Sequence, residues 1–139
     1  MRKILTIAAV LTTGCSSLQA QTVQRTAIAV HDAVEIAMPV WVEYVDRKVS
    51  ECEAKGLKTR DEGIACLGPA AQADRVADAM VHLKVAQLGV YVGLAEGSPE
   101  AARASTELLR SFREVVAIWT AAGVCSGVCA QVAATLGAR

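Results

Sequence analysis

Apolar residues recur along most of this chain at steps of three and four, the spacing that places side chains on one face of an α-helix. The first such stripe begins after about residue 24 and consists of Ala27, Val30, Val34, Ala37, Trp41, Tyr44 and Lys48. Most charged residues between these positions lie off the stripe. The aliphatic part of Lys48 extends the stripe while its charge stays in water. The pattern predicts a long helix that buries one side.

Two positions limit this first helix. Pro39 lies inside the stripe and removes one helical hydrogen bond, so we expect either a kink between residues 36 and 39 or a break into two helices. Gly56, which follows Lys55, is typical of a helix end because glycine readily adopts the left-handed conformation found there.

A short helix and a third, longer one are expected next. Thr59 and Glu62 have the spacing of a capping box, which predicts a short helix that carries Cys66 and ends at Gly68-Pro69. From about residue 71 to 96 a second stripe repeats in steps of four and three. Gly89 and Gly93 lie within this helix and permit close approach by a neighbouring helix. The stripe consists of Val76, Met80, Leu83, Gln87, Val90 and Leu94.

The fourth helix has the clearest predicted start. Ser98 is expected to cap it and Pro99 to occupy its first position, with Glu100 close to the positive helix end. Its apolar face consists of Leu108, Phe112, Val115 and Trp119, and its charged residues Arg103, Glu107, Arg110 and Glu114 are available to water.

The C-terminal stretch 115–138 contains no charged residue and exceeds the ~20 residues that cross a bilayer. Its content of Ala, Gly, Thr and Ser favours a buried helix followed by a second helix that begins after a glycine break. A membrane-spanning helix over 115–138 stays open as the alternative.

These elements predict an all-α fold, a small helical bundle of about three longer helices plus short ones. The 139 residues suffice for one domain, and 53% hydrophobic residues supply a packed core. Aromatic residues make up only 4%, which favours close-packed helices over an aromatic-rich sheet.

The N-terminus has the layout of an export signal. Arg2-Lys3 is followed by an apolar run over residues 4–11 and then by Gly14-Cys15-Ser16-Ser17. This last segment resembles the lipobox of bacterial lipoproteins, although Thr12 stands where an aliphatic residue is usual. The resemblance implies a signal peptide over 1–14, lipid on Cys15, a tether over 15–24 and one helical domain over 25–139. Cleavage after Ala20, which gives a freely secreted protein, is the alternative, and both place the chain outside the bacterial cytoplasm.

The remaining cysteines form an even set in an oxidising compartment. Cys52 and Cys66 flank the turn after the first long helix, and we predict a disulfide between them that stabilises the fold by ~3 kcal/mol. Cys125 and Cys129 are separated by three residues, whereas redox-active pairs are usually separated by two, so a local structural bridge is favoured. A connectivity in which this pair reaches the first pair is also open.

Charge and motifs exclude several function classes. Lys+Arg and Asp+Glu both total 14, and no basic run follows the leader, so we expect no nucleic-acid partner. The four cysteines lack the paired spacing of zinc modules, and His31 and His82 stand alone. No nucleophile elbow or phosphate-binding loop is present. The sequence therefore predicts no catalytic, metal or cofactor residues and no small-molecule substrate.

The favoured function is that of a non-enzymatic lipoprotein of the cell envelope. Its lipid anchor would hold it on the periplasmic side of a membrane, where it would contact a protein partner or the cell wall. Two alternatives are an exported thiol/disulfide redox protein that uses Cys125 and Cys129, and a small integral membrane protein that spans with 115–138.

Overall fold

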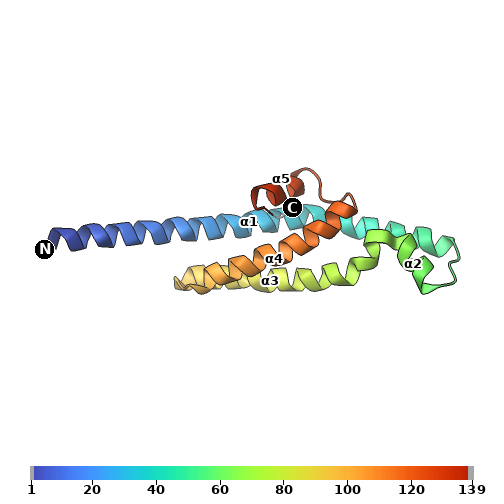
Figure 1. Cartoon of the computed structure of the whole chain (residues 1–139), viewed down its shortest axis with the longest axis horizontal. Helices are drawn as coiled ribbons and strands as arrows, with labels where there is room; N and C mark the ends of the chain where they lie inside the picture. The colour runs from blue at the N-terminus through green and yellow to red at the C-terminus, as the bar shows by residue number, and fades with distance from the viewer. Residues whose placement is uncertain (1, 138–139) are drawn as a thin grey trace.

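The structure, a computed structural model, describes the backbone of residues 2–137 and the side chains from residue 17 to 137. All regular elements in that range are helical. In chain order they are α1 (Arg2–Ala54), α2 (Arg60–Leu67), the 3₁₀ helix η1 (Gly68–Gln72), α3 (Ala73–Glu96), α4 (Glu100–Ala121) and α5 (Val128–Thr135). Three longer helices, α1, α3 and α4, run along the long axis of the molecule (Figure 1). The predicted all-α fold is confirmed.

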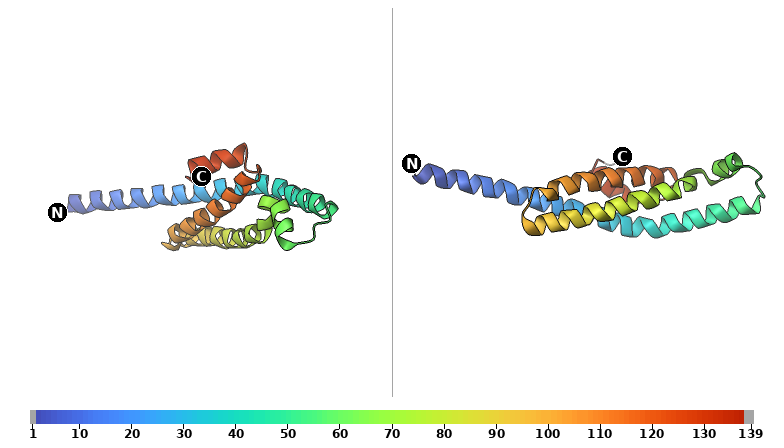
Figure 2. Two further views of the ribbon diagram at one scale, coloured as in Figure 1. Left: turned by 45° about the vertical axis from the view of Figure 1, so that its right-hand side comes forward. Right: turned by 90° about the horizontal axis from the view of Figure 1, so that it is seen from below.

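The first helix is longer than the sequence pattern predicts. Of the two outcomes expected at Pro39, a kink or a break, the break is absent, because α1 is continuous through this residue. Its two halves run in different directions in the right-hand view of Figure 2, so the proline bends the helix without ending it. Residues 15–24, expected to be a tether, are helical and continuous with α1. From residue 17 on, Val23 is the first buried residue of this helix, and the helix before it projects beyond the α3–α4 turn (Figure 1).

The predicted apolar stripes form one core between the three longer helices. On α1 the residues from Ala27 to Trp41 in the stripe are buried, and Tyr44 and Lys48 are half-buried. All four predicted residues of α4 are fully buried, and Trp119 is the largest fully buried side chain of the core. On α3, Gln87 and Leu94 are half-buried, and the buried members are Val76, Met80, Leu83 and Val90.

The helices α3 and α4 form the most extensive contact of the fold, and a glycine allows it. A Cβ atom added to Gly93 would clash with the backbone nitrogen of Ala101 and would lie 2.8 Å from its Cα. The turn between the helices has Gly97 at φ 63°, and the amide of Ser98 donates to the carbonyl of Gly93 over 2.9 Å. The close approach expected from the glycines of α3 is present.

The predicted capping role of Ser98 is wrong. The N-cap position of α4 is occupied by Pro99, whose backbone is already helical, and no side chain caps the helix. Ser98 instead accepts the amide of Ala101 with its own carbonyl, in a 3.4 Å contact, while its hydroxyl is buried without a hydrogen-bond partner. The amides of Ala101 and Ala102 are paired with the carbonyls of Ser98 and Pro99, so backbone hydrogen bonds take the place of a serine cap in the first turn of α4.

The uncharged C-terminal stretch forms two separate helices. Its first part completes α4, the chain then turns with Gly123 at φ 71° and Gly127 at φ 53°, and α5 follows. The short helix packs against α1 and buries Cys129 and Ala133. Among the described residues no helix has both the length and the apolar character needed to cross a bilayer.

Candidate functional site

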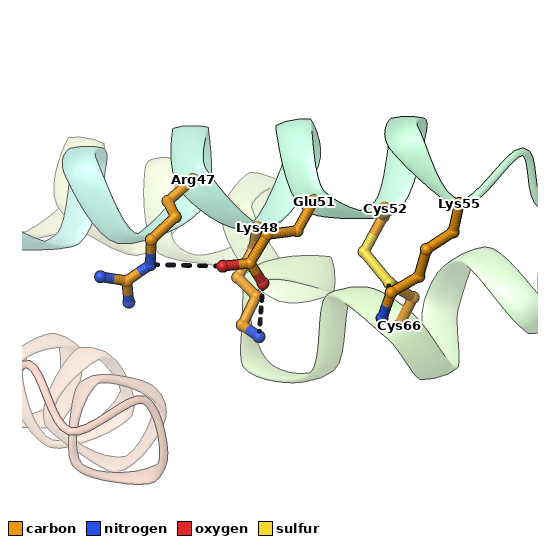
Figure 3. The surroundings of a disulfide bond; sticks show 6 residues. All are labelled: Arg47, Lys48, Glu51, Cys52, Lys55 and Cys66. Carbon is orange, nitrogen blue, oxygen red and sulfur yellow. Dashed lines mark hydrogen bonds and ion pairs between the residues drawn. A yellow bond between two sulfur atoms is a disulfide. The ribbon is translucent and has the colours of Figure 1, made fainter.

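The first disulfide closes the end of the bundle where α1 meets α2. Cys52 lies in the last turns of α1 and is buried, and Cys66 lies near the end of α2 and is half-buried. Their Cα atoms are 5.9 Å apart, and the two sulfurs are bonded (Figure 3). The predicted pairing is confirmed. It joins two helices across an exposed turn, which contributes few other contacts.

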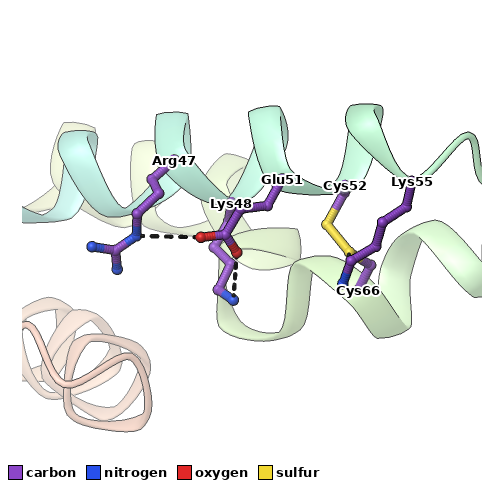
Figure 4. A network of polar contacts seen from close by, with 6 residues as sticks. All are labelled: Arg47, Lys48, Glu51, Cys52, Lys55 and Cys66. Carbon is purple, nitrogen blue, oxygen red and sulfur yellow. Dashed lines mark hydrogen bonds and ion pairs between the residues drawn. A yellow bond between two sulfur atoms is a disulfide. The ribbon is translucent and has the colours of Figure 1, made fainter.

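Charged side chains lie before and after Cys52 on the surface of α1. The carboxylate of Glu51 lies 3.1 Å from the ammonium of Lys48 and 3.8 Å from the guanidinium of Arg47 (Figure 4). The ammonium of Lys55 lies 3.7 Å from the sulfur of Cys66. All these groups are solvent-exposed or half-exposed, and such pairs contribute little to stability. Lys55 is thus placed at the disulfide, while the other three residues precede Cys52 along α1 (Figure 3).

The start of α2 is fixed by the capping box that the sequence predicts. The amide of Glu62 donates to the Thr59 hydroxyl over 3.2 Å. In return the Glu62 carboxylate accepts the amides of Lys58, over 3.0 Å, and Thr59, over 3.3 Å. These two hydrogen bonds, led by the one from Lys58, stabilise the charged form and hold the pKa of Glu62 below its ordinary value. The box orients α2 so that Cys66 meets Cys52.

The second disulfide joins Cys125 and Cys129, whose Cα atoms are 5.1 Å apart. Cys125 is half-buried in the turn after α4, and Cys129 lies in the first turn of α5 with 1% of its surface exposed. The alternative connectivity between the two cysteine pairs is not formed. This bridge fixes the angle at which α5 returns onto the core, and its buried sulfur atom is difficult for an external thiol to attack.

Cys15, the predicted lipidation site, lies where the structure describes only the backbone. That backbone belongs to α1, eight positions before Val23, a buried residue of the core. At the rise of an α-helix this separation corresponds to about 12 Å. The side chain of Cys15, and with it the predicted lipid, lies outside the described side chains. The helical backbone gives the distance of Cys15 from the bundle.

A groove of about 810 Å³ lies between α1 and α3. Its apolar residues include Met38 and Met80, one from each helix, and its charged rim includes both acidic and basic side chains. On the α1 side, Arg47 stacks over Tyr44, with its guanidinium carbon 5.7 Å from the ring centroid. The remaining residues that line the groove are Val34, Glu35, Pro39, Val42, Glu43, Asp46, Arg47, Ser50 and Lys84.

The structure also presents a surface that the sequence analysis missed. The side of α3 turned away from the core is apolar and exposed, and we call it the α3 ridge: Val81, Val85, Leu88 and Val92. These residues repeat at steps of four, three and four, so the signal is present in the sequence. The ridge was missed because α3 carries two apolar stripes with the same period, and only the stripe assigned to the core was considered.

The candidate residues do not converge on one chemical centre. The two disulfides lie on different elements, and His31 and His82 are both exposed. Within residues 17–137 no group of three or more His, Cys, Asp or Glu side chains is placed to hold a metal ion. Comparison with models of protein families, with curated proteins and with solved structures found no match. Function must therefore be inferred from the surfaces and cysteines of this chain.

Proposed function

We propose that this chain is an exported lipoprotein that carries lipid on Cys15 and acts, without catalysis, through protein contacts at a bacterial membrane. The observation that carries the proposal is the pairing of the cysteines. The four that follow Cys15 are bonded to one another in two local pairs. Lipidation of Cys15, within Gly14-Cys15-Ser16-Ser17, therefore takes no cysteine away from the fold.

Two disulfides indicate a domain that folds outside the reducing cytoplasm. The proposed anchor would join this domain through α1, which enters the core about 12 Å beyond Cys15. A continuous helix transmits direction, whereas a flexible linker does not. The bundle would thus be held close to the membrane surface with its long axis set by α1.

The role as a contact module is supported by the exposed aliphatic side chains. They lie on two of the three longer helices, and contiguous apolar surface of this kind is typical of interaction sites. On α1 they include Ile36 and Val40, and on α3 they form the α3 ridge. A partner protein in the envelope or the cell wall is the class of target that we propose.

The test is the intact mass of the protein recovered from bacterial membranes, together with incorporation of a labelled fatty acid. We expect a chain that begins at Cys15 and carries a diacyl or triacyl group, with four cysteines that alkylate only after reduction and unfolding. Cys15→Ala should abolish the label. The matched control Ser16→Ala should retain it, because the acyl groups are attached to Cys15, through its sulfur and its α-amine, and not to Ser16.

Two results would contradict the proposal. A mature chain that begins at Gln21 without lipid would make this a freely secreted protein, and an uncut, unlabelled precursor would refute export. Mild reductant provides a separate test of the redox alternative. If Cys125 and Cys129 are reduced selectively while Cys52 and Cys66 stay bonded, a redox role replaces the structural one. We expect resistance, since Cys129 is buried.

A further inference from the structure

The α3 ridge and the core face occupy opposite sides of one helix. With 3.6 residues per turn, Val81, Val85 and Leu88 point away from the direction of the buried residues Leu83 and Val90. The right-hand view of Figure 2 looks onto the open side of α3, which lies between α4 and α1. A helix that is apolar on both sides is normally buried on both sides. In the described chain, nothing buries this ridge.

The neighbouring helix shows that this fold does not require an apolar outer surface. The outward side of α4 carries Arg103, Glu107 and Arg110, which form ion pairs along the helix. The two helices pack against each other and have similar lengths. Because α4 meets solvent with charges while α3 meets it with Val and Leu, the difference points to a contact made by α3 alone.

We infer that the α3 ridge is the interface of a homodimer, in which α3 of one copy packs antiparallel against α3 of a second copy. The ridge has the alternating spacing of a coiled-coil seam, and its spacing is the same when read in reverse. Antiparallel pairing sets Val85 against Leu88 of the second copy. It also sets Val81 against Val92 of the second copy, so four apolar layers form. The contact is isologous, as a two-fold dimer requires.

Charge determines the orientation. Asp74 and Asp78 continue the seam toward the start of α3 and are exposed. In a parallel pair each aspartate would face the same aspartate of the second copy. Like charges in direct opposition are destabilising. In the antiparallel pair, Asp78 faces Ala95 of the second copy, and Asp74 lies beside the turn beyond α3. In the antiparallel register no two acidic residues are therefore in direct opposition, although Glu96 of the second copy follows the Ala95 that Asp78 faces.

The exposed area is sufficient for a weak dimer. The four ridge residues and the adjacent Tyr91 each leave between 41% and 66% of their surface exposed. Together they amount to roughly 500 Å² per copy, so a pair would bury about 1,000 Å², near the lower limit of specific interfaces. Acidic residues on α3 (Asp74, Asp78 and Glu96) outnumber Arg75 and Lys84. This balance opposes a membrane surface as the occupant, because interfacial helices are rich in Lys and Arg.

The inference goes beyond the proposed lipoprotein role and does not depend on it. Its test is sedimentation equilibrium of the purified chain, with both disulfides intact, from about 1 to about 500 µM. We expect the average mass to rise from one chain toward two. Val85→Glu and Leu88→Glu should remain single chains throughout, with the dissociation constant raised at least about 100-fold. Ile28→Glu, at a position on α1 that is 44% exposed, should dimerise like the natural chain.

All variants share one N-terminus, so lipid there affects their association equally. Val85 and Leu88 are 66% and 64% exposed, so at about 1 µM, where every chain is single, glutamate at either site should leave the thermal midpoint unchanged. If a glutamate variant fails to fold, Leu88→Gln replaces it and should still weaken the dimer. A natural chain that stays single throughout the range overturns the inference. So does a dimer that Val85→Glu leaves intact, or binding of single chains to lipid vesicles through the ridge.

Orientation is tested by cross-linking under oxidation. Chains with Val81→Cys and chains with Val92→Cys should form a mixed disulfide-linked dimer when combined, and neither should cross-link efficiently alone. Mass mapping verifies that the two natural bridges persist. Efficient self-linkage of either variant would indicate a parallel pair and would overturn the antiparallel arrangement.

Discussion

Replacement of Gly93 by alanine tests whether the α3–α4 contact depends on the absence of a side chain. The new methyl group would clash with the backbone nitrogen of Ala101, and it would lie 2.8 Å from the Cα and 3.0 Å from the Cβ of that residue. Real Cβ atoms do not approach backbone atoms this closely, so α3 and α4 must separate locally. No change of rotamer relieves the clash, because two of the three obstructing atoms are backbone.

Two effects of opposite sign determine how much Gly93→Ala changes the free energy of unfolding. Alanine is favoured over glycine inside a helix by about 0.5–1 kcal/mol. Overpacking of a close contact costs about 1–3 kcal/mol, and a clash with backbone lies in the upper part of that range. We therefore expect Gly93→Ala to lower the free energy of unfolding by about 1–2 kcal/mol. For a domain of this size the midpoint of thermal unfolding should fall by about 3–8 °C.

Urea and thermal unfolding with the disulfides intact measure this change, and two other glycines provide controls. Gly63 lies inside α2 with nothing within 4 Å of an added Cβ, so Gly63→Ala should stabilise by about 0.5–1 kcal/mol. At Gly89 an added Cβ would lie 3.1 Å from the Cβ of Ala104, a milder contact with a side chain, and the effect should fall between the two. If Gly93→Ala is as stable as the natural chain, the close α3–α4 approach is refuted.

Two further predictions concern the disulfides and the capping box. Serine replacement of both partners should cost about 3 kcal/mol for Cys52–Cys66 and about 2 kcal/mol for Cys125–Cys129, because the first bond closes the longer loop; equal losses in urea unfolding would contradict this reasoning. The ionised carboxylate of Glu62 stabilises the start of α2, and this contribution should be complete at pH values above the ordinary glutamate pKa of about 4.3. Since the folded pKa is lowered, that contribution is lost as the pH falls through the lowered value, and amide exchange at the two donors should then accelerate. Glu62→Gln should abolish this pH dependence, and persistence of the pH dependence in this variant would assign it to another group.

Local sequence rules predicted the parts of the fold that local chemistry determines. The capping box needs only Thr59 and Glu62 at the right spacing, and it forms as predicted. The buried face of α4 follows from its clear segregation of apolar and charged residues. The Cys52–Cys66 bond follows from a short turn between two helices, which keeps the cysteines close whatever the rest of the chain does.

Tertiary contacts outweigh local preference at two positions: at Pro39 they select the kink over the break, and at Ser98 they overturn the predicted cap. Pro39 lacks one helical hydrogen bond, yet Ala37 and Trp41 on either side are both buried in the core and hold the two halves of α1 together. The proline itself faces solvent, so a bend is enough to accommodate its ring. Ser98 is a favourable capping residue in isolation, but the preceding turn fixes the backbone and buries its hydroxyl. Neither outcome can be read from neighbouring residues alone.

The side of α3 that is buried is set by residue size, which periodicity alone does not report. Ala79, Ala86 and Gly93 recur every seven residues and are all buried, and at Gly93 the backbone of α4 approaches too closely for any side chain. Val81 and Leu88 also lie seven residues apart, each two positions after one of the buried alanines. Their side chains are too large for such a close contact. The bundle therefore fixes which side of α3 faces inward, and polar residues on the outward side would serve its packing equally well. An aliphatic ridge retained where the fold does not need it is best explained by a contact outside the single chain.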